Sequence, residues 1–110
     1  ALNYYEKVLT LSKEIKNTNL YLKGVHHKGN IYYDLLDFEL AEQLFIRAID
    51  GYLKQSAYSK LVFLYNNLGN IANIRNDLGS EEWYRKLSYD LAVDLHNIVE
   101  RTNIVSFKTS

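Results

Sequence analysis

The chain has 110 residues, with 13 Lys and Arg against 13 Asp and Glu and therefore no formal net charge. An apolar fraction of 47% and an aromatic fraction of 14% are enough for a packed core and argue against a disordered chain. The cations are scattered, which argues against a nucleic-acid platform, and the lack of Cys excludes disulfides and thiolate metal sites.

No stretch of the sequence predicts a membrane segment. The longest apolar run, LVFLY at 61–65, is far too short to cross a bilayer, and no signal-peptide pattern opens the chain. We therefore expect a cytoplasmic protein. Because the first residues, ALNYYEKVL, already have helical spacing, we expect an excised fragment of a longer chain or a processed product.

The absence of Pro and the presence of only five Gly predict long helices. Apolar residues recur at helical spacing in five stretches, which are 2–16, 20–35, 38–54, 59–76 and 80–98. Breaks are expected at 16–19, 36–37, 55–59 and 76–80, and the residues expected to cap the following helices are Asn19, Asp37, Ser59 and Ser80.

An internal repeat of 40 residues underlies this series. KGNIYYDLLD at 28–37 aligns with LGNIANIRND at 68–77, so that Gly29 matches Gly69 and Asn30 matches Asn70. The same offset places YYEKVL at 4–9 on LFIRAI at 44–49. A tandem array of helical hairpins is therefore predicted.

The residues at these positions resemble the tetratricopeptide repeat. Gly29 and Tyr32 match its G-x2-Y, Ala41 and Phe45 match its A-x3-F, and YNNLG at 65–69 matches its aromatic-x2-L-G. The glycine and alanine positions allow helices to approach closely. The unit is longer than the common one of about 34 residues and lacks the terminal proline.

The last hairpin departs from the pattern, because strict offset puts Glu81 where Ala41 stands and Arg85 where Phe45 stands. A one-residue deletion would instead place Ser80, Tyr84 and Leu87 at the repeat positions, and it is the preferred alignment.

The resemblance implies an all-α, tetratricopeptide-like helical-hairpin solenoid of about five antiparallel helices. Residues 1–110 would form a single repeat fragment. Its parts would be the second helix of a truncated unit at 1–17, complete units at 20–55 and 59–98, and a tail or the start of the next unit at 99–110. Units of this length also resemble the peptide-sensing domains of Rap, Rgg and PlcR-type bacterial transcriptional regulators, as well as kinesin-light-chain-type and cell-polarity adaptors.

In this fold the first helix of each hairpin lines a concave surface, so its outer face is the expected ligand surface. Side chains there combine donors and acceptors that suit an extended peptide. The predicted peptide-binding residues are Lys23, His26, Asn30, Tyr33, Phe63, Asn66, Asn70 and Asn73. The alternative to a ligand-binding role is that these asparagines form a solvent-exposed helix face in an Asn-rich sequence.

The expected function is binding of a short signalling peptide or a protein partner, as in quorum sensing, by the sensor part of a transcriptional regulator. The alternative is a constitutive protein–protein scaffold without a signalling ligand. Self-association is expected, because an array needs about three units to stand alone. No cofactor, membrane contact or direct nucleic-acid contact is expected.

No constellation of residues predicts catalysis, since no nucleophile lies near a base and no glycine loop cradles a phosphate. His26 and His27 point about 100° apart on a helix, which argues against a shared metal ion.

Overall fold

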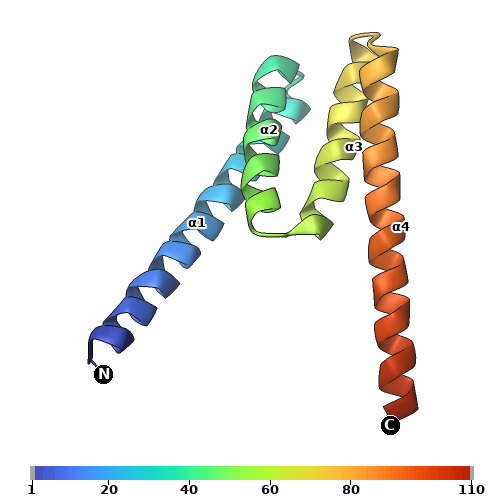
Figure 1. The fold of residues 1–110 in the computed structure, drawn as a ribbon. Helices are drawn as coiled ribbons and strands as arrows, with labels where there is room; N and C mark the ends of the chain where they lie inside the picture. The colour runs from blue at the N-terminus through green and yellow to red at the C-terminus, as the bar shows by residue number, and fades with distance from the viewer. Residues whose placement is uncertain (1, 110) are drawn as a thin grey trace. The chain divides into compact units, whose positions relative to one another are not determined.

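The computed structural model describes the backbone of residues 2–109 and the side chains of residues 6–101. Between residues 2 and 109 it contains four α-helices, α1 (Leu2–Asp34), α2 (Phe38–Lys54), α3 (Tyr58–Ile74) and α4 (Leu78–Thr109). Helices α1 and α2 form one antiparallel pair, and α3 and α4 form another (Figure 1). The all-α class expected from the sequence is confirmed.

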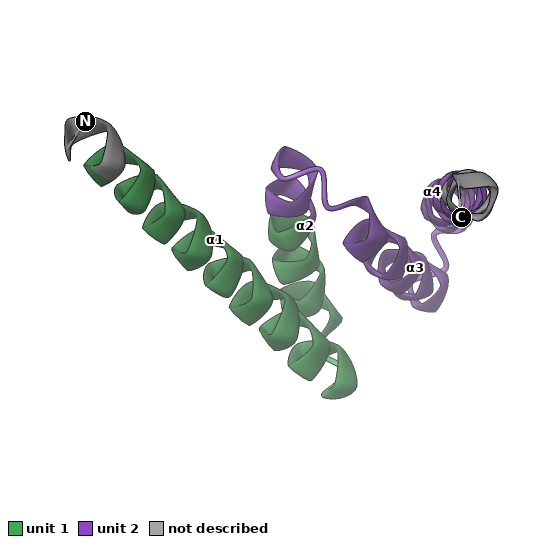
Figure 2. Ribbon diagram, turned by 90° about the horizontal axis from the view of Figure 1, so that it is seen from below, with its two compact units in different colours: residues 1–48 green, residues 49–110 purple. Residues whose placement is uncertain are grey.

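The chain divides into two compact units, residues 1–48 and residues 49–110 (Figure 2). In the first unit the buried apolar side chains are Leu22, Val25, Ala41, Phe45 and Ala48. In the second they are Ile49, Tyr52, Leu61, Leu64, Leu68, Ile71 and Ala72. Removal of such side chains from water contributes about 1.5–3 kcal/mol for each large one.

Three links between helices share one backbone geometry. The residues Leu36, Ser56 and Asn76 have φ values of 65°, 55° and 60°, and they recur every 20 residues. At the first link the Asp37 N–H donates to Tyr32 O at 2.9 Å and the Leu36 N–H donates to Tyr33 O at 3.0 Å. This bonding pattern, repeated at the other two links, is the Schellman motif that closes a helix.

Side chains cap the helices that follow the first and third links. Oδ1 of Asp37 accepts from the Leu40 N–H at 3.3 Å, as expected from the sequence, and Oδ1 of Asp77 accepts from the Ser80 N–H at 3.2 Å. The expected cap at Ser80 is therefore wrong by three residues. The expectation for Ser59 is also wrong, because Ala57 occupies the N-cap of α3 and makes no side-chain bond.

The expectation of five helices is wrong, because α1 runs without a break through 16–19. Asn19 therefore lies inside α1 and is not the N-cap of a helix. Thr18 bonds its Oγ1 to Glu14 O at 2.9 Å, so its hydroxyl is satisfied along the helix. The last helix likewise continues past 98 to Thr109, in a stretch with no Pro or Gly to end it. The alternatives for 99–110 stay open, and side chains 102–110 lie outside the described residues.

The strict 40-residue alignment holds through the second pair of helices. Helix α2 begins at Phe38 and α4 begins at Leu78, with no residue deleted between them. Ser88, at the position equivalent to the buried Ala48, is itself buried and donates its Oγ to Val62 O at 2.9 Å. The preferred one-residue deletion is therefore wrong, and Arg85 occupies the position of Phe45.

Candidate functional site

In the first hairpin, α1 packs tightly against α2 at Gly29. A Cβ added there would lie 2.7 Å from Cε1 of Phe45, so only glycine fits. The ring of Phe45 is fully buried and has two aromatic neighbours on α1. The His26 ring lies 6.5 Å away in an edge-on arrangement, and the Tyr33 ring lies 6.2 Å away. Phe45 thus packs against the rings of His26 and Tyr33.

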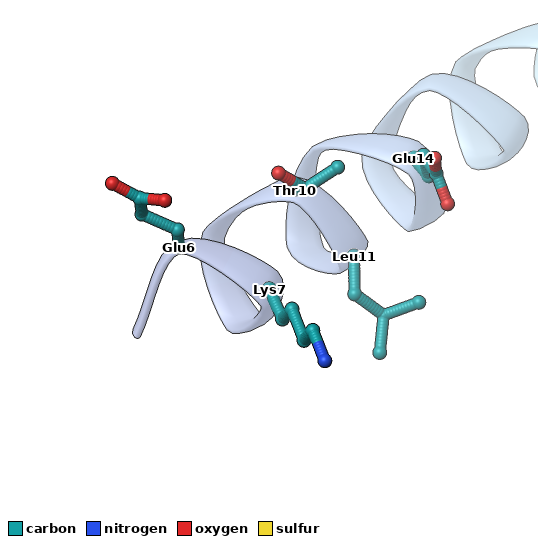
Figure 3. A pocket seen from close by; sticks show the side chains of 5 residues that line it. All are labelled: Glu6, Lys7, Thr10, Leu11 and Glu14. Atoms are coloured by element: carbon teal, nitrogen blue, oxygen red, sulfur yellow. The ribbon is translucent and has the colours of Figure 1, made fainter. Parts of the chain in front are cut away.

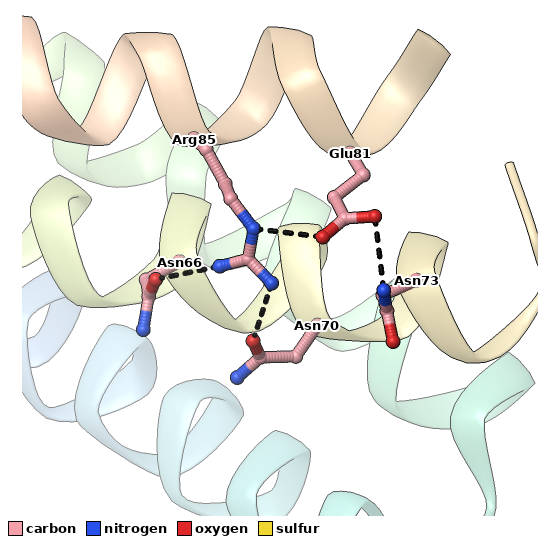
Figure 4. A network of polar contacts seen from close by, with 5 residues as sticks. All are labelled: Asn66, Asn70, Asn73, Glu81 and Arg85. Carbon is pink, nitrogen blue, oxygen red and sulfur yellow. Dashed lines mark hydrogen bonds and ion pairs between the residues drawn. The ribbon is translucent and has the colours of Figure 1, made fainter. Parts of the chain in front are cut away.

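In the second hairpin, Arg85 replaces that phenylalanine and the surrounding side chains are polar. A Cβ at Gly69 would lie 3.3 Å from Arg85 Cγ, so the arginine stem crosses the glycine. Its guanidinium donates from Nη1 to Asn66 Oδ1 at 3.3 Å and from Nη2 to Asn70 Oδ1 at 3.1 Å (Figure 4). The two amides therefore supply acceptors to a cation on the neighbouring helix.

Glu81 completes this arrangement. It accepts from Arg85 Nε at 2.9 Å and from Asn73 Nδ2 at 3.0 Å (Figure 4). The hydrogen bonds from Asn73 and Arg85 hold the pKa of Glu81 below its ordinary value. We call the five residues the arginine network, and its members are Asn66, Asn70, Asn73, Glu81 and Arg85.

The predicted groove residues lie on two helices, and their surroundings differ. On α1, Lys23 and Asn30 are exposed, whereas His26 and Tyr33 are half-buried beside Phe45. On α3, Phe63 is 69% exposed, and Asn66, Asn70 and Asn73 all bond to α4. Peptide binding by these eight residues stays a prediction.

Two members of the arginine network, Glu81 and Arg85, were not among the predicted site residues. A signal for them was present, since strict offset placed Glu81 on Ala41 and Arg85 on Phe45. Phe45 is buried, whereas Arg85 is exposed, so the N–H donors of its guanidinium can bond to water or to amide oxygens on α3. Asn66 and Asn70 supply two such acceptors.

Hollows on the described surface include two that are bordered by none of the predicted residues. One is bordered by Glu6, Lys7, Thr10, Leu11 and Glu14, which all belong to α1, so it is the side of one helix (Figure 3). An apolar hollow of about 270 Å³ lies in the second unit, where Tyr58 of α3 meets Leu91, Leu95 and Ile98 of α4.

Within the described residues, no group of three or more His, Cys, Asp or Glu side chains is placed to hold a metal ion. No helix in the described part of the chain is long and apolar enough to cross a membrane. The absence of catalysis stays a prediction from the sequence.

Comparison of the chain with protein-family models, with curated proteins and with solved structures found no match. The structure of residues 2–109 shows an all-α protein with four helices packed in adjacent pairs.

Proposed function

We propose that the chain is a tetratricopeptide-like helical-repeat module that binds an extended peptide or protein segment. The observation that carries this proposal is the arginine network, which orients a row of amides on α3. By its resemblance to peptide-sensing regulators, the module would act as the sensor of a bacterial transcriptional regulator in the cytoplasm.

The side chains on α3 supply the chemistry for such a ligand. Phe63, Asn66, Asn70 and Asn73 are spaced by three, four and three residues, so they share one face of the helix. The Oδ1 atoms of Asn66 and Asn70 point to Arg85, and their amide nitrogens are turned away from it (Figure 4). The N–H group of an asparagine suits the carbonyl oxygens of a peptide backbone, as that of Asn66 would, and the exposed Phe63 ring suits an apolar side chain.

The first hairpin carries an equivalent face of different chemistry. Lys23, His26, Asn30 and Tyr33 stand 40 residues before the four positions on α3. Lys23 adds a positive charge where α3 has Phe63, so the two faces would prefer different ligand side chains.

We predict that Asn70→Ala and Asn30→Ala each weaken peptide binding about two- to tenfold, the worth of one hydrogen bond. The probe is a peptide selected from a random 12-residue display library on the wild-type chain, titrated by calorimetry. Asn30→Ala is informative because Asn30 lies outside the arginine network. Asn67→Ala is the matched control and leaves affinity unchanged. Failure to select any peptide, or equal affinity of all variants, contradicts the proposal.

A folded protein partner is the second candidate, and exposed aromatic side chains on α4 favour it. Trp83 is 59% exposed and Tyr89 is 70% exposed, and such residues are enriched at the energetic centres of protein interfaces. Flanking sequence discriminates between the two. An upstream helix-turn-helix favours a peptide-responsive regulator, whereas further repeats alone favour a constitutive scaffold.

A further inference from the structure

The N-terminal half of α1 carries an apolar stripe with no cover in the described chain. All side chains from residue 6 to residue 20 are exposed. Val8, Leu11 and Ile15 are 43%, 57% and 53% exposed, and they are spaced by three and four residues. The same spacing continues along the helix to Leu22 and Val25, which are only 2% and 6% exposed. The bare stripe is therefore continuous with a face that is buried further along the helix.

Charged residues of opposite sign border this stripe on one side. Lys7 and Glu14 are seven residues apart, so they lie on the same edge of the helix, and Leu11 stands between them in the sequence (Figure 3). In heptad terms Val8 and Ile15 are a positions, Leu11 is a d position, and Lys7 and Glu14 are successive g positions.

We propose that the stripe pairs with the same stripe of a second copy of this chain, in antiparallel orientation about a twofold axis between Val8 and Leu11. Antiparallel pairing sets a positions against d positions, so Val8 lies against Leu11 of the second copy, and it brings the g positions of both helices together. Lys7 then faces Glu14 of the second copy, and Glu14 faces its Lys7, giving two ion pairs across a closed, self-complementary interface.

The charges select this orientation. In a parallel pair each g residue faces the e position of the next heptad, which is Ser12 for Lys7 and Asn19 for Glu14, and neither carries a charge. The contact is short, with three apolar positions per copy, and falls below the roughly 1,200 Å² of a standard stable interface. The dimer is accordingly weak and forms at high micromolar to millimolar chain concentration.

Sedimentation equilibrium of the whole chain at low salt tests this pairing. Wild type shows a concentration-dependent monomer–dimer equilibrium, and Leu11→Lys abolishes it. Lys7→Glu and Glu14→Lys each weaken dimerisation about tenfold, because each replaces both attractive pairs by repulsive ones. An equimolar mixture of the two variants restores dimerisation to the wild-type level, as does the double variant.

The matched controls reverse charges on the far side of the helix. Lys13 lies about 160° and Glu6 about 140° around the helix from Leu11, so Lys13→Glu and Glu6→Lys leave dimerisation unchanged. Circular dichroism verifies that each variant keeps its helix content. A wild-type chain that stays monomeric at millimolar concentration overturns the proposal. Dimerisation that is insensitive to Leu11→Lys, or a mixture that fails to restore pairing, also overturns it.

Discussion

The two hairpins differ in the residue that packs against the glycine in the first helix of each. Phe45 lies against Gly29, and Arg85 lies against Gly69. The neighbouring residues change as well. Asn66 stands in the second hairpin where the first has His26, Asn73 where it has Tyr33, and Glu81 where it has Ala41. The Phe45 ring packs against other aromatic rings, whereas the guanidinium of Arg85 has five N–H donors that form hydrogen bonds with acceptors. The amides of Asn66 and Asn70 thus have a structural role as acceptors to Arg85.

At this scale we predict opposite effects of two Gly→Ala substitutions in α1. Gly29→Ala forces a Cβ to 2.7 Å from the Phe45 ring and should lower the free energy of unfolding by about 1–3 kcal/mol. Gly24 has no atom within 4 Å of an added Cβ, so Gly24→Ala should raise it by about 0.5–1 kcal/mol. Urea unfolding followed by circular dichroism measures both, and equal stability of the two variants contradicts the close contact.

Among the structural elements, the links show which signals end a helix. Each link holds one residue at positive φ, and only at Asn76 does the sequence supply a type that tolerates it well. Leu36 adopts the same conformation at a cost of about 1–2 kcal/mol, and its side chain is 73% exposed.

Leu36→Gly should therefore stabilise the chain by about 1 kcal/mol, since it relieves the left-handed strain and loses little buried surface. Leu35 is the matched control, because it is 69% exposed and does not have a positive φ. Leu35→Gly should destabilise the chain by up to about 1 kcal/mol. Thermal unfolding of both variants measures the difference, and a lower melting temperature for Leu36→Gly counts against this account.

Helix α1 continues through residues 16–19, and the reason is the lack of buried apolar side chains in its N-terminal half. A break there would leave backbone groups without helical partners, and burial of apolar side chains must offset that loss. Residues 6–20 are all exposed, so nothing compensates for a turn. Asn and Thr residues are weak helix formers, but they do not end a helix as Pro does.

Over the whole molecule, the two helix pairs differ in their charged side chains, and two carboxylates with lowered pKa values lie in the second pair. The side-chain hydroxyl and the N–H of Ser80 hold the pKa of Asp77 below its ordinary value of 3.8. Bonds from Asn73 and Arg85 likewise keep the pKa of Glu81 below 4.5. Both carboxylates lie in the second hairpin, whose stability should therefore depend on them in acid.

A depressed pKa in the folded state means that these bonds stabilise the second hairpin fully above the ordinary pKa values. The stabilisation is lost as the pH falls below them, through the folded values. We predict that the urea midpoint seen by Trp83 fluorescence, a probe on α4, falls between pH 6 and pH 3. The fall should be smaller in the double variant Asp77→Asn with Glu81→Gln. An equal fall in wild type and double variant rules out this source of acid sensitivity.

Much of the candidate site could be located, though not explained, from the sequence. The helical spacing placed Phe63, Asn66, Asn70 and Asn73 on one face, and the 40-residue echo placed their equivalents on α1. The bonding partner of the asparagine amides could not be inferred from the alignment with a one-residue deletion. In that alignment Arg85 does not occupy the position that faces Gly69.

By itself the sequence determined the all-α class, the helix at 38–54, the cap at Asp37 and the close approach at Gly29. These depend on residues within about one helical turn, or on a repeated pattern visible in the chain. The tertiary structure decided the continuity of α1, the pairing register and the partners of the asparagines. Arg85 stands 15 residues from Asn70 and 19 from Asn66, so their bonds exist only because two helices pack side by side.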